Sequence, residues 1–585
     1  MGALWGLGIA GLLVPHLPDP LTTLAAGAVV GATAALLRPS LPALAHPTAA
    51  TLAAVAGVFM VRLPEPTFFL LAPLVAAAVA WPLGPNKGED RPLPAWILPA
   101  SFALAAAVFF VQAANRHWQF GSGAKDMGLF VQQHWLIAHG YVPINTVMGM
   151  HMLADHMYFL DFLVAPLFLV HGGAETLLLV QALGVASGVL PLFWAARQLL
   201  GSSRAALSVA WTWLLSPDVH MGIMFDYNPS LLGATGLLWT AWALLVRGPV
   251  AVLVTALLTC AAKTDFPPYV AVLALGLALL RWIPWRRGIA VAALALAIFT
   301  VEIGVISPLF REGGFRHWDF PELGETPGEI AAAGLTRPDR AAAVLVSNPD
   351  KRRSLLLPLL GSGYLGLAQP LSLALQLPNW GERFLSAHRT RWWGYYYGMP
   401  GAATAILGAL FGWRRLQTAA LASRRTPVYL LSCALLAGLL PPYRTPSGNT
   451  RSDLYYLRQP YTSAPENVRT QRAAVAFIGR DPRLRVAAQY NLLPHLAQRP
   501  FVVELDRALD ADVVALQIDG GTHPGGRPGW RRQVREILET RAFHVAFCQG
   551  RSVVLRRGPG SDVACPAWEE VVARLEEGTG SGPMQ

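Results

Sequence analysis

The sequence contains few charged residues. Asp, Glu, Lys and Arg make up only 14% of its 585 residues, whereas soluble globular proteins carry about 25%. Hydrophobic residues account for 54%, and long apolar runs such as 228–246 and 289–301 have no hydrophilic face. A soluble protein with buried helices would need such faces. The composition therefore predicts an integral membrane protein.

Lysine is scarce, and the net charge of +11 comes almost wholly from arginine. The lysines are Lys87, Lys125, Lys263 and Lys351. Most arginines cluster in short loops between apolar runs, as they do on the cytoplasmic side of membrane proteins. No basic stripe interleaved with aromatic residues is present, so we expect no nucleic-acid partner.

The sequence lacks several common nucleotide-binding and catalytic motifs, and it contains few cysteines. There is no Walker loop, which disfavours ATP-driven transport, and no HExxH or G-x-S-x-G motif. Of four cysteines, Cys260 and Cys433 lie in apolar runs, while Cys548 and Cys565 lie in a polar C-terminal region. The latter two can form a disulfide if that region is extracytoplasmic, but the sequence does not establish that they meet.

The apolar runs predict about fifteen membrane spans. The first five are 3–15, 20–37, 48–62, 66–84 and 95–113, and the first is shorter than the ~20 residues that a span needs. Placing Arg38, Lys87 and Arg91 in the cytoplasm puts the N-terminus inside and residue 114 outside. Most later arginine clusters then also fall inside, Lys351-Arg352-Arg353 being the exception.

In this orientation the acidic and histidine-rich loops all lie on the outer side. They are 115–166, 216–229, 263–265 and 379–397. The first of these is the longest polar stretch among the spans. Polar groups are costly in lipid, so a polar island beside a bilayer faces water or holds a site. We therefore expect the chemistry of the protein in residues 115–166.

Asp126 follows a Gly-Ser-Gly turn and precedes a predicted helix, Met127 to His139. A carboxylate at this point can deprotonate an acceptor hydroxyl. It can equally cap the helix N-terminus, which is a common place for Asp. Both alternatives stay open on the sequence.

Asp155 and His156 form a second polar pair in the loop. His151 and Asp155 have the i, i+4 spacing of one helical face. With Asp126, these groups could ligate a divalent metal beside a phosphate. Alternatively, they hydrogen-bond the loop to the helix bundle.

Asp226, in the sequence FDYNP, and Asp265, in KTDF, lie at the outer ends of spans. Lys125 and Lys263 each neighbour a candidate acid, and lysine binds phosphate as a point charge. We interpret Lys125, Lys263, Asp265, Asp226 and His156 as candidates for binding the substrate or its phosphate, with the lysines holding the phosphate. The alternative is local ion pairing that offsets partial burial.

Residues 443–575 differ from the rest of the chain. Short valine-rich runs appear, namely RVAAQ, PFVVEL, DVVALQI, HVAFC and SVVLRR. Each has the length of a strand and is bounded by turn residues, and helices are expected at 466–479 and 530–541. These features predict a small extracytoplasmic α/β domain, followed by a disordered tail at 576–585.

From residue 95 to about 560 the chain resembles a family of predicted bacterial membrane proteins, domain of unknown function 2079. The resemblance is carried by KDMGLFVQQHWLIAHG, ADHMYFLDFLVAPLFLV, LLLVQALGVASGVLPLFWAARQLLG, MFDYNPSLLG, KTDFPPYVAVLALGLAL, LPNWGERFLS with WWGYYYGMP, and VAAQYNLLPHLAQRPFVVEL. That family is similar in layout to the polyprenyl-phosphate-dependent GT-C glycosyltransferases. The resemblance implies a GT-C-like core at 95–442 with an outer loop at 114–173, and additional N-terminal helices at 1–94.

The resemblance also implies a function. GT-C enzymes carry a catalytic acid in the first large outer loop, use a lipid-linked sugar and transfer it on the outer face; Asp126 occupies that position here. This chain has Lys-Asp where better-known branches have an acidic pair, which leaves the metal requirement open. We therefore expect a multi-pass protein of the cytoplasmic membrane that takes a sugar from a polyprenyl-phosphate donor to an envelope glycan or lipid acceptor. The alternatives are a transporter or flippase of lipid-linked precursors and a non-catalytic envelope scaffold.

Overall fold

The computed structural model describes residues 65–80, 92–422, 425–438, 466–518, 520, 522–523 and 525–576. The chain divides into two compact units. Unit 1 comprises Met1–Phe109, Ala182–Phe225 and Pro229–Tyr455, and unit 2 comprises Phe110–Gln181, Asp226–Asn228 and Tyr456–Gln585. The helices predicted at 3–15, 20–37 and 48–62 lie outside the described residues.

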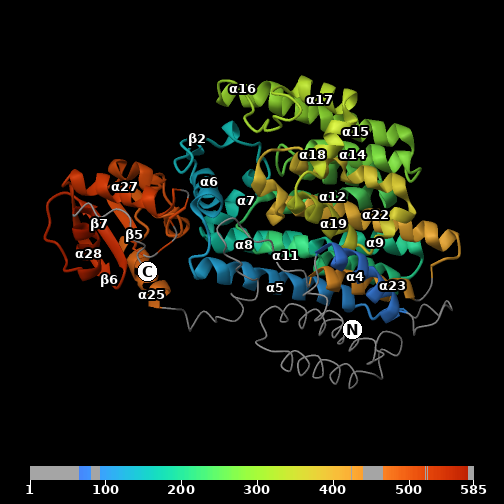
Figure 1. Cartoon of the computed structure of the whole chain (residues 1–585), viewed down its shortest axis with the longest axis horizontal. Helices are drawn as coiled ribbons and strands as arrows, with labels where there is room; N and C mark the ends of the chain where they lie inside the picture. Colours follow the sequence, from blue (N-terminus) through green and yellow to red (C-terminus); the bar gives the residue numbers. More distant parts are fainter. Residues whose placement is uncertain are drawn as a thin grey trace, which may run out of the picture. The chain divides into compact units, whose positions relative to one another are not determined.

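Unit 1 is helical throughout its described part (Figure 1). Its helices are α4 (Glu65–Ala80), α9 (Val189–Leu200), α10 (Ser203–Leu215), α11 (Pro217–Ile223), α12 (Pro229–Val246), α13 (Pro249–Cys260), α14 (Phe266–Leu279), α15 (Trp285–Val301), α16 (Ser307–Phe310), α17 (Pro327–Thr336), α18 (Pro338–Leu345), α19 (Pro349–Gly361), α20 (Leu377–Phe384), α21 (Arg389–Trp392), α22 (Met399–Thr418) and α23 (Arg425–Gly438). Helices α5 (Ile97–Trp118) and α8 (Ala174–Ser187) each contribute residues to both units.

Helix α22 forms the centre of unit 1. Every residue from Met399 to Trp413 is buried, and the helix packs against α12 and against two 3-10 segments, η8 (Leu365–Ala368) and η9 (Pro370–Gln376). A side chain at Gly412 would put its Cβ 1.8 Å from the carbonyl oxygen of Leu365. Small residues at such points allow membrane helices to approach closely.

Four helical segments among the described residues are long and apolar enough to cross a membrane. They are Ile97–Trp118, Ala174–Leu200, Pro229–Val246 and Trp285–Phe310, and they correspond to the predicted spans 95–113, 174–199, 229–246 and 288–306. Shorter apolar helices run over Thr67–Ala80, Pro249–Cys260 and Phe266–Leu279. The prediction of a polytopic helical membrane bundle is confirmed, while the total of about fifteen spans stays a prediction.

Unit 2 contains the polar loop and the C-terminal α/β fold. Its remaining elements are α6 (Leu129–Ala138), β1 (Ile144–Asn145), β2 (Met150–His151), α7 (Asp161–Val164), α25 (Glu466–Ile478), β3 (Val486–Ala488), α26 (Leu493–Leu496), β4 (Val502–Val503), β5 (Val513–Gln517), α27 (Gly526–Glu539), β6 (Phe543–Gln549), β7 (Ser552–Arg557) and α28 (Pro566–Glu576). All five valine-rich runs form strands, as predicted.

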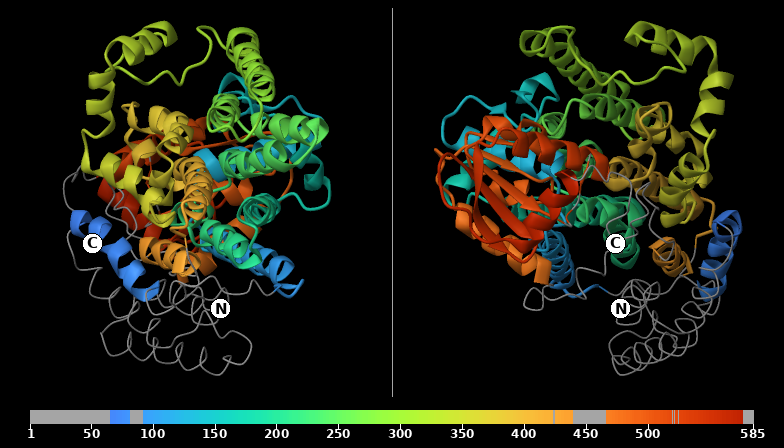
Figure 2. Two further views of the ribbon diagram at one scale, coloured as in Figure 1. Left: turned by 90° about the vertical axis from the view of Figure 1, so that its right-hand side faces the viewer. Right: turned by 60° about the vertical axis from the view of Figure 1, so that its left-hand side comes forward.

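The five strands form one mixed sheet in the order β4-β3-β5-β7-β6 (Figure 2, right). Strands β4, β3 and β5 are parallel, whereas β7 is antiparallel to both β5 and β6. Alternate side chains of β5 and β7 point to opposite faces. One face forms a core with α27 and α28 that includes Leu516, Val553, Trp530 and Trp568. Helix α25 packs against β5, β6 and β7.

Two details of unit 2 differ from, or add to, the sequence analysis. Cys548 on β6 and Cys565 before α28 form a disulfide, with their Cα atoms 5.7 Å apart, which the sequence had left open. Helix α28 was not predicted, although its apolar residues Trp568 and Val571 enter the sheet core. The predicted tail, 576–585, lies beyond the described residues except for Glu576, the last residue of α28.

Candidate functional site

Asp126 lies in a π-helical turn, η4 (Ala124–Gly128), which leads directly into α6. The turn begins after Gly123, whose backbone is extended. The positions that cap η4 and α6 are Gly123 and Gly128, which have no side chain to accept a hydrogen bond. Asp126 is therefore within the turn and half-buried, and it is not the helix cap that the sequence allowed.

A partly buried ion pair holds the entrance of this turn. The guanidinium of Arg116, near the end of α5, contacts the carboxylate of Asp226. The other Asp226 oxygen accepts a hydrogen bond from the backbone N–H of Gly123 at 2.8 Å. Asp226 is only 2% exposed, so burial strengthens both contacts. Predicted as a phosphate-binding residue, Asp226 here anchors the turn that carries Lys125 and Asp126.

Tyr490 packs against the same turn, and the sequence analysis did not single it out. A Cβ built on Gly123 would lie 2.3 Å from the Tyr490 hydroxyl oxygen, so any side chain there must displace the phenol ring. Burial raises the pKa of Tyr490 well above its usual value, and the nearby charges of Asp126 and Asp226 raise it further. The phenol therefore stays protonated, so its hydroxyl is able to donate a hydrogen bond. The available signal was its place in the motif VAAQYNLLPHL.

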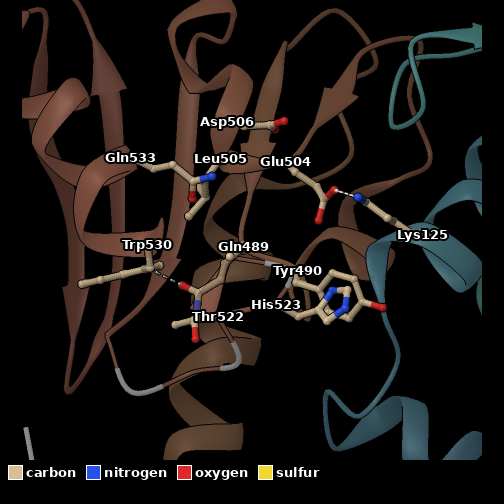
Figure 3. A pocket seen from close by; sticks show the side chains of 11 residues that line it. Lys125, Gln489, Tyr490, Glu504, Leu505, Asp506, Thr522, His523, Trp530 and Gln533 are labelled. Atoms are coloured by element: carbon tan, nitrogen blue, oxygen red, sulfur yellow. Dashed lines mark hydrogen bonds and ion pairs between the residues drawn. The ribbon is translucent and has the colours of Figure 1, made fainter. Parts of the chain in front are cut away.

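Lys125 points away from the turn toward the C-terminal strands (Figure 3). Its ammonium nitrogen lies 3.6 Å from Oε2 of Glu504, and the two side chains are 43% and 12% exposed. Burial raises the pKa of Glu504, and Lys125 partly offsets that shift. A loose pair of this kind leaves the lysine able to contact an incoming group. Glu504 was not a candidate in the sequence analysis.

Asp155 and His156 lie further along the loop, in an arrangement unlike the predicted one. His151 ends strand β2, and its Nδ1 accepts a hydrogen bond from Leu153 N–H at 3.2 Å. A single 3-10 turn, Met152–Ala154, separates it from Asp155. The expected helical face is therefore wrong, because the chain is extended at His151. His156 is buried, with its ring edge-on to Tyr158; metal binding by Asp155 and His156 stays a prediction.

Lys263 and Asp265 lie in unit 1, in the short connection between α13 and α14. The Lys263 ammonium is 2.5 Å from Oδ2 of Asp265, and Lys263 is 5% exposed. Burial alone would lower the pKa of Lys263, but Asp265 and Glu382 outweigh it and raise the pKa. The lysine is therefore a charged, tightly paired cation.

Glu382, on α20, belongs to the same cluster. Its Oε2 accepts a hydrogen bond from the Tyr269 hydroxyl at 2.8 Å. Burial raises the pKa of Glu382, as does the charge of Asp265, while Lys263 and Arg391 lower it. Residues 379–397 were predicted to lie on the outer side, but no role was predicted for Glu382. Its only signal was its position in the motif LPNWGERFLS.

The predicted residues thus form three groups. In unit 2, Lys125 and Asp126 lie in one turn, which Asp226 anchors through Gly123, and Asp155 and His156 lie further along the loop. In unit 1, Lys263 and Asp265 form one ion-paired cluster. The turn combines a half-buried carboxylate, a phenol donor and a partly exposed ammonium, which are the groups needed to activate a hydroxyl and to bind an anionic leaving group.

Comparison with known proteins places the chain in a family. The model of predicted membrane proteins designated DUF2079 matches residues 116–536. Crystal structures of ArnT from Cupriavidus metallidurans are similar to this chain at low identity. The structure bound to undecaprenyl phosphate has a TM-score of 0.47 and 13% identity, covering 80% of this chain and 100% of that one. The apo structure has a TM-score of 0.48 and 14% identity, covering 79% and 99%. No curated protein matches the sequence. This multi-pass membrane protein belongs to the DUF2079 family.

Proposed function

We propose that the protein is a membrane glycosyltransferase that moves a sugar from a polyprenyl-phosphate donor to a cell-envelope acceptor. The observation that carries the proposal is the half-buried Asp126 in a turn fixed by the partly buried Arg116–Asp226 ion pair. A carboxylate held in this way is preorganised to act as a base. The donor class follows from the layout resemblance of the sequence to GT-C enzymes. We assign the reaction to the outer face of the cytoplasmic membrane, with the N-terminus inside.

In the proposed reaction Asp126 removes the proton from an acceptor hydroxyl. The acceptor oxygen then bonds to the anomeric carbon of the donor sugar as the bond between that carbon and the phosphate oxygen breaks. The polyprenyl phosphate leaves with the bonding electron pair, and configuration at the anomeric carbon is inverted. Tyr490, protonated beside Asp126, would orient the carboxylate or the acceptor.

The leaving phosphate needs positive charge. Lys125 is the better candidate in unit 2, because its side chain is 43% exposed and its pair with Glu504 is loose. Lys263 is a secondary candidate, since Asp265 already neutralises it. If a divalent metal takes part, Asp155 and His156 offer an oxygen and a nitrogen ligand that together suit transition metals better than Mg²⁺.

The proposal is tested by Asp126→Asn, with Asp481→Asn as the matched control. Asp481 is an exposed acid of unit 2 that pairs with Arg483 on the surface. Membranes of a strain lacking the gene would carry each version, and lipid-linked sugars and surface glycans would be measured by mass spectrometry. We expect Asp126→Asn to lower the rate of transfer by roughly 10²-fold or more, as loss of a general base does, so that one lipid-linked sugar accumulates, and Asp481→Asn to match wild type. A wild-type glycan profile with Asp126→Asn would refute the proposal.

A proton-coupled transporter is the second candidate, and one residue favours it. Asp218 on α11 is 1% exposed, and neither carboxylate oxygen has a hydrogen-bond partner among the described residues. Burial raises the pKa of Asp218 to about 7, and Arg383 opposes that shift. Unpaired buried acids often mark proton pathways in membrane proteins. In the same strains, an effect of Asp218→Asn on precursor distribution without any effect of Asp126→Asn would favour transport.

A further inference from the structure

A pocket opens in unit 2 at the carboxyl ends of the three parallel strands (Figure 3). Gln489 and Tyr490 directly follow β3, Glu504 directly follows β4, and Thr522 and His523 lie in the connection from β5 to α27. The chain passes from β3 outward to β4 on one side and returns to β5 on the other. In open α/β sheets, ligands bind at this reversal of strand order, beyond the carboxyl ends of the strands.

The floor of the pocket is rigid. Gln489 is buried, and its Oε1 accepts hydrogen bonds from the backbone N–H of Gln517 at 2.9 Å and from Trp530 Nε1 at 3.3 Å. The first bond ties the end of β3 to the end of β5, and the second ties both to α27. Walls that are already ordered avoid the loss of side-chain and loop entropy that ligand binding would otherwise require.

The charges of the lining select the ligand. Glu504 and Asp506 are carboxylates, and Lys125 is the matching cation at the rim. Burial and Lys125 lower the pKa of His523, so the imidazole is neutral at pH 7 and the lining has a net charge of about −1 by the usual side-chain charges. An anionic ligand is disfavoured by that balance.

The remaining polar side chains of the lining include both hydrogen-bond donors and hydrogen-bond acceptors. Gln533 and Thr522 add an amide and a hydroxyl to the carboxylates and the phenol of Tyr490. Carboxylates form strong hydrogen bonds with hydroxyl donors. A ligand with several hydroxyls, neutral or bearing an amine, satisfies this lining, whereas a purely apolar ligand does not.

The size of the pocket suits the polar edge of one sugar residue. The pocket has a volume of about 60 Å³, which is enough for roughly four to six water molecules at about 10–15 Å³ each. The pocket also shares a wall with the candidate base. Lys125 is the neighbour of Asp126 in the chain, and Tyr490 contacts Gly123 of the same turn.

We propose that this pocket binds a neutral or amino-bearing saccharide and that this saccharide is the acceptor of the transfer reaction. The second part rests on the proposed function. The first part stands on the pocket alone, because the position, charge and hydrogen-bonding groups do not depend on Asp126.

The test uses the full-length protein in lipid nanodiscs and saturation-transfer NMR. The probes are glucosamine, N-acetylglucosamine, galactose and inorganic phosphate. We expect at least one saccharide to bind, and phosphate, which can pair with Lys125 at the rim, to bind more weakly than that saccharide. Glu504→Gln and Asp506→Asn should each weaken that binding roughly tenfold, the effect of losing a hydrogen bond to a charged group. Asp506 is exposed, so its variant is not expected to impair folding. Glu570→Gln, an exposed acid on α28 paired with Arg574, is the matched control.

The outcomes separate the two proposals. Unchanged saccharide binding in both pocket variants, no saccharide binding to wild type, or tighter binding of phosphate than of any saccharide would overturn the pocket assignment. If saccharide binding depends on Glu504 and Asp506 but no glycan changes in the Asp126→Asn strain, the pocket stands and the transferase function falls. If transfer requires Asp126 but its acceptor KM is unchanged by both pocket variants, the transferase stands and the acceptor assignment falls.

Discussion

At the scale of single residues, the geometry of the candidate site depends more on the close approach of Tyr490 to the backbone of Gly123 than on the charged side chains. Gly123 brings three features together: its N–H binds Asp226, its Cα faces the Tyr490 hydroxyl, and its extended backbone starts the turn with Asp126. A side chain here must displace the phenol. The ring is packed, since Tyr490 contacts the His523 ring with centroids 4.6 Å apart.

We therefore predict that Gly123→Ala lowers the stability of unit 2 by about 1–3 kcal/mol, the usual cost of overpacking. It should also reduce transfer, because Tyr490 and Asp126 lose their relative positions. Thermal unfolding of the purified protein, followed by intrinsic fluorescence, measures the first effect.

Gly529→Ala provides the control, because a Cβ at this position on α27 meets no atom within 4 Å. Alanine there should leave the melting temperature unchanged or raise it slightly, since it favours a helix over glycine by up to about 1 kcal/mol. Equal melting temperatures for Gly123→Ala and wild type would show that Tyr490 moves aside at no cost.

Some of these residues can be predicted from the sequence and others cannot, for a physical reason. Asp126 and Lys125 stand out because charge is rare beside apolar helices. Tyr490 and Glu504 follow them by more than 360 residues, and both sit at the ends of ordinary valine-rich strands. Only the fold brings them to the turn. Asp226 was recognised as polar, but its use as an anchor for Gly123 could not be read from its position in FDYNP.

At the scale of elements, the sequence predicted the helices and strands whose formation depends mainly on the local pattern of hydrophobic and turn residues. The strands β3 to β7 were found because valine-rich runs bounded by turn residues favour strands. Helix α28 was missed, although the disulfide ties Cys565, the residue before it, to β6. The π-helical turn η4 was missed too, because the Gly-Ser-Gly sequence before it has no pattern that distinguishes it from an ordinary helix start.

The disulfide between Cys548 and Cys565 closes a loop with a sequence separation of 17 residues. The chain-entropy relation gives about 3 kcal/mol for a loop of this size. We predict that replacing both cysteines by alanine lowers the free energy of unfolding of unit 2 by about that amount, as measured by urea unfolding monitored with hydrogen exchange of β6 and β7.

A reductant gives the matching control. It should lower the stability of the wild-type protein toward that of the double variant, and it should leave the double variant unchanged. If the reductant acts equally on both, the effect lies elsewhere in the chain and the bond contributes nothing to this fold.

At the scale of the whole molecule, the arginine distribution and the disulfide make one joint prediction. Arg247 follows α12, and Arg286 and Arg287 lie in the first turn of α15. Positively charged segments between spans stay in the cytoplasm. Counting spans from there puts residues 443–575 outside, where disulfides form and persist. Both lines of argument thus predict that the C-terminal α/β fold lies on the outer side, which the proposed acceptor pocket also requires.

Reporter fusions test this orientation. Alkaline phosphatase fused after Gln585 should be active, because the enzyme needs the oxidising outer compartment, while fusion after Arg247 should be inactive. Green fluorescent protein at the same two points should give the opposite pattern. In intact cells, Cys548 and Cys565 should react with a membrane-impermeant maleimide only after reduction. A fluorescent C-terminal fusion, or thiols that react without reduction, would put the pocket in the cytoplasm and leave an envelope acceptor without access to Asp126.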